Sequence, residues 1–449
     1  MKKIHITSLG CAKNFVDSEV ILGQLQHDDW QAVEQPEQAD ILLVNTCGFI
    51  QPAVEEGVDA ILELADIKKN APAMKLVVSG CMVQRYREKL KEEIPEIDLL
   101  VGTEGVENIQ KLFNALVERV EIPLLHMPQR FLMDHQIPRT LATPSFRAWM
   151  KITEGCNNCC SYCMIPSIRG PLRSRSLDDL QNEAVILEQK GVREVSLIAQ
   201  DLTAYGCDGR DGDNNQQLVP LLHRLVDNTT INWIRLLYLY PTGITDELLD
   251  LMAKNNRIVP YLDIPFQHAS TRVLHRMNRL YSHEMLFSLI QRIRTKLPEA
   301  ALRTTFLLGF PGEKDADVED LGSFLEEVKL DHVGVFAYSN EEGSASEFYD
   351  DQISEEEKHN RVEYIHTLQS SISAEIQKKY VGTVQDVLVE GLSRETDLLL
   401  EGRTRFQAPD IDGCVLINDG QARPGDFVQV EVSEAQTYDL VGGIVPSVP

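Results

Sequence analysis

The nine residues GCNNCCSYC (Gly155 to Cys163) decide how the rest of the chain is interpreted, because they place four cysteines on one short loop. Two overlapping spacings compete here: C-x-x-x-C-x-x-C uses Cys156, Cys160 and Cys163, whereas C-x-x-C-x-x-x-C uses Cys159 in place of Cys160. A zinc site closes a tetrahedron of four ligands, and no second cysteine or histidine pair follows at a suitable distance. Iron–sulfur clusters also normally take four cysteines. Three thiolates therefore predict a cluster with one iron left open for a substrate.

Around this loop, residues 142–379 alternate strand and helix patterns, which predicts an α/β fold. Helical patterns lie near residues 177–189, 217–226, 246–254, 282–296 and 317–328, and a long charged helix, 354–379, closes the segment. The expected strands are RAWMKITEG (147–155), EVSLIAQDL (194–202), INWIRLLYLY (231–240), YLDIPFQHA (261–269), LRTTFLLGF (302–310) and HVGVFAYS (332–339). Six such units predict a partial or full (β/α) barrel, whose active site lies at the carboxyl ends of the strands.

Residues 1–140 form a separate segment with the same alternation. The expected strands are KKIHITSLG (2–10), ILLVNTC (41–47) and KLVVSGC (75–81), with helices near 14–27 and 53–67. Strands that alternate with helices predict a parallel sheet. The stretch PQRFLMDHQIPRTLATP (128–144) contains three prolines and is interpreted as a linker that ends near Pro144.

Three cysteines of this first segment, about 35 residues apart, occupy equivalent positions. SLGC, VNTC and VSGC each end an expected strand, with Cys11, Cys47 and Cys81. Parallel α/β sheets bind ligands beyond the carboxyl ends of their strands, so the three thiols can converge there. A glycine beside each cysteine would relieve crowding. The alternative is three buried structural cysteines, a common fate of free thiols, but the matched placement favours convergence.

The last segment, residues 380–449, changes character. Short strands are expected at VQDVLVEG (384–391), DLLLEGRT (397–404), GCVLIND (413–419) and DFVQVEVSEA (426–435), separated by Gly, Pro and Asp turns. This pattern predicts a small antiparallel β-barrel. Residues 381–449 carry 12 Asp and Glu against 4 Arg, a local charge of −8.

Composition limits the partners and the compartment. Nine cysteines in 449 residues are too sparse for a disulfide scaffold. No apolar run approaches the ~18 residues of a membrane helix, and the first residues lack the features of a signal peptide, so we expect a cytoplasmic protein without a membrane partner. The net charge of −26 favours a basic or neutral partner over the phosphates of nucleic acid.

The C-x-x-x-C-x-x-C spacing, with Tyr162 before its last cysteine and after the first strand of a βα barrel, resembles that of the radical S-adenosylmethionine superfamily. The resemblance implies that Cys156, Cys160 and Cys163 hold a 4Fe–4S cluster, that S-adenosylmethionine chelates the open iron, and that Cys159 is a bystander. TTFLLGFPGE (304–313) resembles the family's glycine-containing stretch beside the adenine. Further expected cofactor contacts, at strand ends or in this turn, are Gln200, Gln267, Gly309 and Gly312.

The order SLGCAKN, VNTCGF and SGCMVQR, followed by the radical S-adenosylmethionine loop and a small barrel, is similar to that of the methylthiotransferase family over nearly the whole chain. This similarity implies a second 4Fe–4S cluster on Cys11, Cys47 and Cys81, where the sulfur to be inserted is held. It also implies a C-terminal TRAM domain, an OB-like barrel that binds the macromolecular substrate, and an electron donor such as a flavodoxin or ferredoxin.

In that family, reductive cleavage of S-adenosylmethionine gives a radical that abstracts hydrogen from a C–H bond too weakly acidic for any side-chain base. No catalytic side chain is therefore expected beyond the cluster ligands. An electron-transfer or iron-sensing protein is the non-enzyme alternative, but such carriers normally saturate each cluster with four cysteines.

The family divides by substrate. One branch modifies adenosine beside the anticodon of tRNA, and another modifies the β-carbon of an aspartate in small-subunit ribosomal protein twelve. A tRNA-binding barrel should be basic, whereas charges of −8 and −26 would attract a basic ribosomal protein, either free or within the ribosomal subunit. We therefore expect the ribosomal-protein substrate, with tRNA methylthiolation as the alternative.

Overall fold

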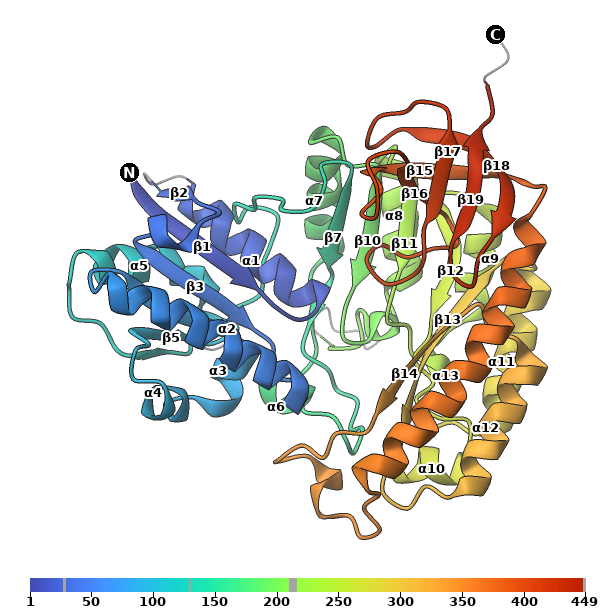
Figure 1. Cartoon of the computed structure of the whole chain (residues 1–449), viewed down its shortest axis with the longest axis horizontal. Coiled ribbons are helices and arrows are strands. Elements are labelled where there is room, and N and C mark those ends of the chain that lie inside the picture. The colour runs from blue at the N-terminus through green and yellow to red at the C-terminus, as the bar shows by residue number, and fades with distance from the viewer. Residues whose placement is uncertain (27–29, 129–130, 210–215, 447–449) are drawn as a thin grey trace.

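The computed structural model describes the chain except residues 27–29, 129–130, 210–215 and 447–449. It contains two six-stranded sheets and one closed barrel (Figure 1), together with a short two-stranded sheet of β8 (Thr153–Glu154) and β9 (Arg173–Ser174). These sheets fall within the three segments that the sequence patterns delimit. None of the described helices is long and apolar enough to cross a membrane.

The N-terminal sheet is entirely parallel, in the order β2-β1-β3-β4-β5-β6. Strand β3 is buried along its whole length because helices cover both faces of the sheet. The strands are β1 (Lys2–Ser8), β2 (Trp30–Ala32), β3 (Ile41–Thr46), β4 (Lys75–Gly80), β5 (Leu99–Val101) and β6 (Leu125–His126). The helices are α1 (Ala12–Leu25), α2 (Gln51–Asn70), α3 (Cys81–Tyr86), α4 (Lys89–Glu93) and α5 (Ile109–Val117).

The predicted strands β1, β3 and β4 are confirmed, as are the helices that follow the first two. The expected end of the first helix, at residue 27, lies outside the described residues. The short strands β2, β5 and β6 were not predicted, because two or three residues carry too little periodicity to be recognised.

The central sheet has six parallel strands in the order β14-β13-β12-β11-β10-β7. They are β7 (Arg147–Lys151), β10 (Glu194–Ile198), β11 (Trp233–Leu236), β12 (Ile258–Asp263), β13 (Ala301–Leu308) and β14 (His332–Ala337). Strands β7 and β14 do not pair with each other, so this is a partial barrel. Its outer face carries α7 (Leu177–Gln189), α8 (Leu218–Asn228), α9 (Asp246–Lys254), α11 (His283–Lys296), α12 (Asp315–Val328) and α13 (Glu355–Gln377).

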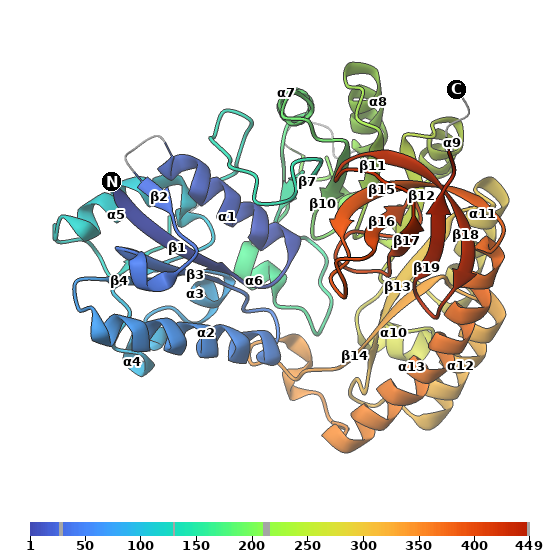
Figure 2. The same ribbon diagram turned by 45° about the horizontal axis from the view of Figure 1, so that its top comes forward.

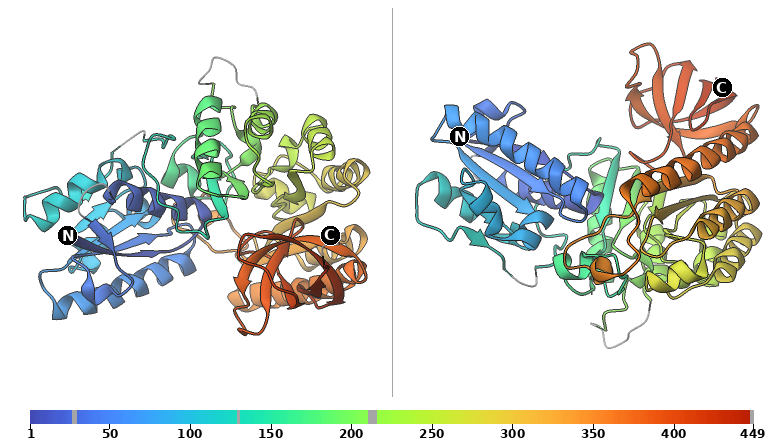
Figure 3. Two further views of the ribbon diagram at one scale, coloured as in Figure 1. Left: turned by 90° about the horizontal axis from the view of Figure 1, so that it is seen from above. Right: turned by 60° about the horizontal axis from the view of Figure 1, so that its bottom comes forward.

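Successive side chains of these strands point to opposite faces of the sheet. One set packs beneath the outer helices. The inward side chains form a second core together with α1 and the C-terminal domain. This core includes Trp149, Ile198 and Trp233 of the central domain, Val16 of α1 and Phe406 of the C-terminal domain. The N-terminal domain and the C-terminal barrel therefore both cover the concave face of the partial barrel. Figures 2 and 3 show that they lie against it at separate places.

The C-terminal barrel is closed, in the order β15-β16-β17-β19-β18. Its strands are β15 (Val384–Leu392), β16 (Leu400–Thr404), β17 (Val415–Asp419), β18 (Phe427–Ala435) and β19 (Leu440–Ile444). The pairing of β17 with β19 is parallel and the other four pairings are antiparallel. The sequence patterns predicted four of these strands and missed β19, whose two central glycines lower its strand propensity.

The barrel docks at the amino ends of the central strands. Glu194, the first residue of β10, accepts a hydrogen bond from Arg403 of β16 at 2.6 Å. Trp233, the first residue of β11, stacks edge-to-face on Phe427 with ring centroids 4.8 Å apart. This docking leaves the carboxyl ends of the strands to the N-terminal domain, where the cysteine loop lies.

Candidate functional site

One cavity of about 340 Å³ lies where the carboxyl ends of the two parallel sheets face each other. The thiols of both predicted triads line it, namely Cys11, Cys47, Cys81, Cys156, Cys160 and Cys163. Residues of the N-terminal and the central domain are thus brought to one space by two separate sheets. The predicted convergence of the three N-terminal cysteines is confirmed as a placement, while their role as ligands stays a prediction.

The N-terminal triad is held by glycines that allow close approach. Gly10 has a φ of +88°, and a Cβ added there would stand 2.7 Å from the Cβ of Cys47. A Cβ on Gly48 would stand 2.8 Å from the backbone of Cys81. Any larger residue would push the loops apart, so the glycines set the separation of the three thiols.

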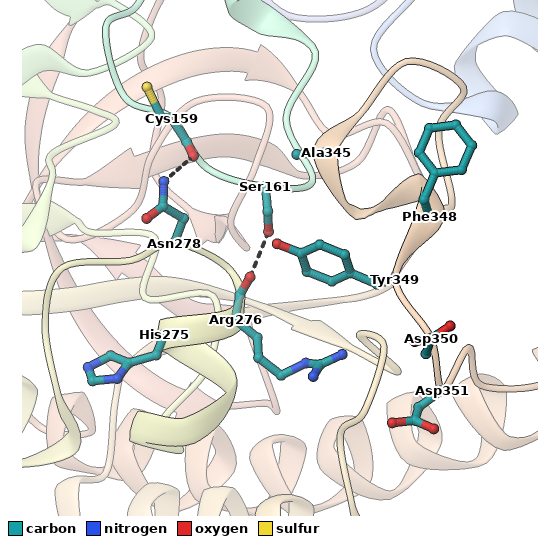
Figure 4. A pocket seen from close by; sticks show the side chains of 10 residues that line it. All are labelled: Cys159, Ser161, His275, Arg276, Asn278, Ala345, Phe348, Tyr349, Asp350 and Asp351. Atoms are coloured by element: carbon teal, nitrogen blue, oxygen red, sulfur yellow. Dashed lines mark hydrogen bonds between the residues drawn. The ribbon is translucent and has the colours of Figure 1, made fainter.

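The central loop distinguishes its four cysteines. Cys156, Cys160 and Cys163 line the cavity, whereas Cys159 is exposed. Cys159 lies at a separate outer hollow of about 560 Å³, where Asn278 donates a hydrogen bond to its carbonyl oxygen at 2.6 Å (Figure 4). Of the two spacings left open by the residues alone, only C-x-x-x-C-x-x-C puts three thiols on the cavity.

Burial opposes the ionisation of several of these thiols. Burial raises the pKa of Cys81 and Cys163 to about 12 and that of Cys156 to about 11. Burial would also raise the pKa of Cys11, but Lys13 and Arg169, with the amides of the first turn of α1, lower it overall. Thiolates bind metals, so iron bound here would supply the charge that stabilises the ionised form.

The chemistry of these donors suits an iron–sulfur cluster. Among the described residues, no group of three or more His, Cys, Asp or Glu side chains is close enough to hold one metal ion. The irons of a cubane cluster lie apart from one another, so its cysteines are farther from each other than the four ligands of zinc. Two groups of three soft thiolates, in one cavity large enough for small ligands, therefore suit iron–sulfur clusters.

A buried arginine connects the two triads. Arg169 belongs to α6 (Ile165–Arg169), which follows the central loop directly. Its guanidinium donates to the thiol sulfur of Cys81 at 3.4 Å and forms ion pairs with Asp17 at 3.1 Å and Glu154 at 3.0 Å. Lys151 pairs with the same two carboxylates. This network joins α1 of the first domain to the central domain behind the cavity.

A second arginine lies on the side of the central loop. Arg279 lines the cavity and is 6% exposed, and its guanidinium stands 4.9 Å from the ring centroid of Tyr240 and 5.9 Å from that of Tyr162. Its Nε has no hydrogen-bond partner among the described atoms. Sequence analysis identified neither Arg169 nor Arg279. Arg169 could have been found from the sequence, because it stands six residues after the last cysteine of the loop. No sequence pattern marks Arg279.

The other expected cofactor contacts divide into two groups. Tyr162, Gln200 and Gln267 line the cavity, and Gln267 has a φ of +70°, a strained conformation for a non-glycine residue that is typical of functional sites. Gly309 and Gly312 are not among the described residues that line it. Their positive φ values, and the approach of Lys358 to Gly309, explain why glycine stands there, so their contact with a cofactor stays a prediction.

Comparison with known proteins agrees with this geometry. Family models match an uncharacterized protein family, UPF0004, over residues 3–102, the radical SAM superfamily over 150–325 and a TRAM domain over 381–445. A solved structure of the radical S-adenosylmethionine methyltransferase TsrM from Kitasatospora setae, with cobalamin and a [4Fe-4S] cluster bound, superposes with a TM-score of 0.51. It covers 86% of this chain and 81% of that one at 14% identity, which shows a shared fold. The chain is a radical S-adenosylmethionine enzyme, a class that uses an iron–sulfur cluster and S-adenosylmethionine.

Full-length relatives identify the family within this class. The ribosomal protein uS12 methylthiotransferase RimO of Desulfotalea psychrophila is 57% identical over 443 residues, 99% of each chain. The protein of the same name from Syntrophotalea carbinolica is 45% identical over 99% of this chain and 97% of that one. The chain belongs to the RimO family of methylthiotransferases.

Proposed function

We propose that this chain attaches a methylthio group to the β-carbon of an aspartate in ribosomal protein uS12. The observation that carries the proposal is the single cavity lined by two three-cysteine sets. A reaction that needs a carbon radical and a sulfur donor in the same place requires both sites to face one space. The full-length relatives named for this activity support the choice of reaction and substrate.

The two sets would each hold a 4Fe–4S cluster with one open iron. Cys156, Cys160 and Cys163 would hold the one that S-adenosylmethionine chelates, and the N-terminal set would hold the one that carries the sulfur. When bound, these groups supply reductive cleavage, hydrogen abstraction and sulfur delivery. The chain itself would orient them in a cavity that residues of both domains line.

Arg279 would bind the carboxylate of S-adenosylmethionine. It is a buried guanidinium on the central side of the cavity, with no carboxylate partner among the described residues. A bidentate pair with a carboxylate would satisfy its free donors. Tyr162 and Gln200 line the same side and would contact the rest of the cofactor.

The surface of the barrel favours a basic protein over tRNA. The seven exposed acidic side chains of the barrel face solvent with only two exposed arginines, Arg394 and Arg423. The acids are Asp386, Glu395, Asp397, Asp410, Asp419, Glu431 and Glu434. Such a surface would attract a basic ribosomal protein and repel phosphates. A one-electron donor such as a flavodoxin or ferredoxin completes the proposed set of partners.

The test is a competition in one vessel. The full chain, reconstituted with iron and sulfide, is given S-adenosylmethionine, a reductant, uS12 and tRNA, and both macromolecules are analysed by mass spectrometry. The proposal expects a methylthio group on an aspartate of uS12 and none on tRNA. Modified tRNA beside unmodified uS12 would overturn the choice of substrate. Absence of 5′-deoxyadenosine would overturn the class of reaction.

A further inference from the structure

Some of the charged side chains that line the cavity have a partner of opposite charge or a hydrogen-bond donor, and others have no carboxylate partner. Arg169 is neutralised by two carboxylates, and Asp201 accepts hydrogen bonds from Asn158 at 2.7 Å and from Thr203 at 2.6 Å. Lys13 and Arg279 have no carboxylate partner among the described residues. The cavity therefore presents two cations that have no carboxylate partner among the described residues, one beside each triad.

Lys13 is the cation on the side of the N-terminal triad. Its side chain is 5% exposed, and no described residue offers its ammonium a hydrogen bond or an ion pair. Its ammonium lies over the face of Tyr238, whose ring centroid is 3.4 Å from Nζ. Lys13 also lies in the first turn of α1, where the helix dipole disfavours a positive charge. An ammonium on the wall of a cavity, with no ion-pair partner among the described residues, can form a charge-assisted hydrogen bond with an anion bound there.

The surroundings of Lys13 match the position that a substrate must take. Lys13 stands two residues after Cys11 and lines the same cavity. Tyr238, which covers the ammonium, has a φ of +64°, and its amide is fixed by the carboxylate of Asp263 at 3.0 Å. The ammonium thus lies beside the N-terminal triad, on the wall of the cavity.

We propose that Lys13 binds the side-chain carboxylate of the aspartate that is modified. This inference rests on the proposed function and names the group that selects the residue within the substrate. The β-carbon of aspartate is bonded directly to the carboxylate carbon, so an ion pair at Lys13 holds that carbon beside the triad that carries sulfur. Arg279 and Lys13 then receive the two carboxylates that the reaction brings into the cavity, those of S-adenosylmethionine and of the substrate.

The experiment is a double-mutant cycle on binding. Full-length reconstituted wild type, Lys13→Met, Lys13→Arg and the exposed control Lys254→Met are titrated with uS12 peptides that carry aspartate or asparagine at the target position. In wild type and Lys254→Met, the asparagine peptide should bind on the order of 10- to 100-fold more weakly, the usual value of a hydrogen bond to a charged group. In Lys13→Met the two peptides should bind equally, and Lys13→Arg should restore part of the preference.

The outcomes separate three explanations. If Lys13→Met keeps the full preference for aspartate, the inference is wrong and the proposed function stands. If Lys13→Met loses iron and weakens both peptides by the same factor, Lys13 serves the N-terminal cluster and the inference is again wrong. If wild type binds neither peptide but modifies tRNA, the proposed function itself fails.

Discussion

Replacing Arg403 with methionine should loosen the barrel from the central domain. The guanidinium of Arg403 is 4% exposed and contacts Glu194 at 2.6 Å and Glu390 at 2.7 Å. Methionine has a similar length but no charge, so Glu194 would keep only Arg235, at 2.7 Å, as its cation. Removing one member of a buried ion pair typically costs about 3 to 5 kcal/mol, because the remaining charge is left uncompensated.

The control for this loss is Arg394→Met on the same barrel. Arg394 is 76% exposed and lies 3.7 Å from Asp410, so its loss should cost well under 1 kcal/mol. Urea unfolding and limited proteolysis near residues 378–383, where α13 meets the barrel, measure the two effects. If Arg403→Met unfolds at the same urea concentration as Arg394→Met, the pair does not hold the barrel and the reasoning fails.

The ion pair of Glu194 with Arg403 should also make the stability of the protein depend on pH. Burial would raise the pKa of Glu194, but Arg403 and Arg235 lower it to about 2 from an ordinary value of 4.5. Because the folded pKa is depressed, the stabilisation is complete above pH 4.5 and is lost as the pH falls toward 2. The stability difference between wild type and Glu194→Gln should be constant from pH 7 to 4.5. Below that it should shrink by about 1.4 kcal/mol per pH unit, and a difference that stays constant below pH 4.5 would contradict the assigned cause.

Three further substitutions test the cavity. Gly10→Ala should lower the thermal midpoint and the iron content more than Gly191→Ala, which has a similar φ but open space for a Cβ; equal effects would mean that contact with Cys47 is unimportant. Arg279→Met should weaken S-adenosylmethionine binding about tenfold in equilibrium dialysis with iron retained, and unchanged binding would remove Arg279 from the cofactor site. Arg169→Met should destabilise the chain by about 3 to 5 kcal/mol in urea, because it leaves buried carboxylates short of a cation, and a loss below 1 kcal/mol would contradict that.

Local sequence patterns were sufficient to predict the longer strands and helices of this protein. Hydrophobic runs and turn residues predicted the strands that precede Cys11, Cys47 and Cys81, and parallel pairing then brought the three thiols to one edge of the sheet. Periodicity is a local property, so it succeeded where an element was long enough to show it. It could not recognise strands of two or three residues such as Leu125–His126, which form only because a neighbouring strand pairs with them.

The charged part of the site could not be predicted in the same way. Glu194 and Arg403 are 209 residues apart, and their pairing depends on the docking of two domains. Lys13 was visible within SLGCAKN, but nothing in that stretch indicates that its ammonium is buried beside Tyr238 without an anion. Burial and missing partners are properties of the assembled structure, and they distinguish a binding residue from an ordinary surface lysine.

Modification of uS12 in cells tests the central claim most directly. A strain that lacks its own uS12 methylthiotransferase would express wild type, Cys47→Ala, Cys160→Ala or Cys159→Ala, and uS12 and tRNA would be analysed by mass spectrometry. We predict methylthio-aspartate in uS12 with wild type and with Cys159→Ala, and unmodified uS12 with the other two. Modified uS12 from Cys47→Ala or Cys160→Ala, or a methylthio group on tRNA alone, would contradict the assignment of two cysteine triads to one reaction on this protein.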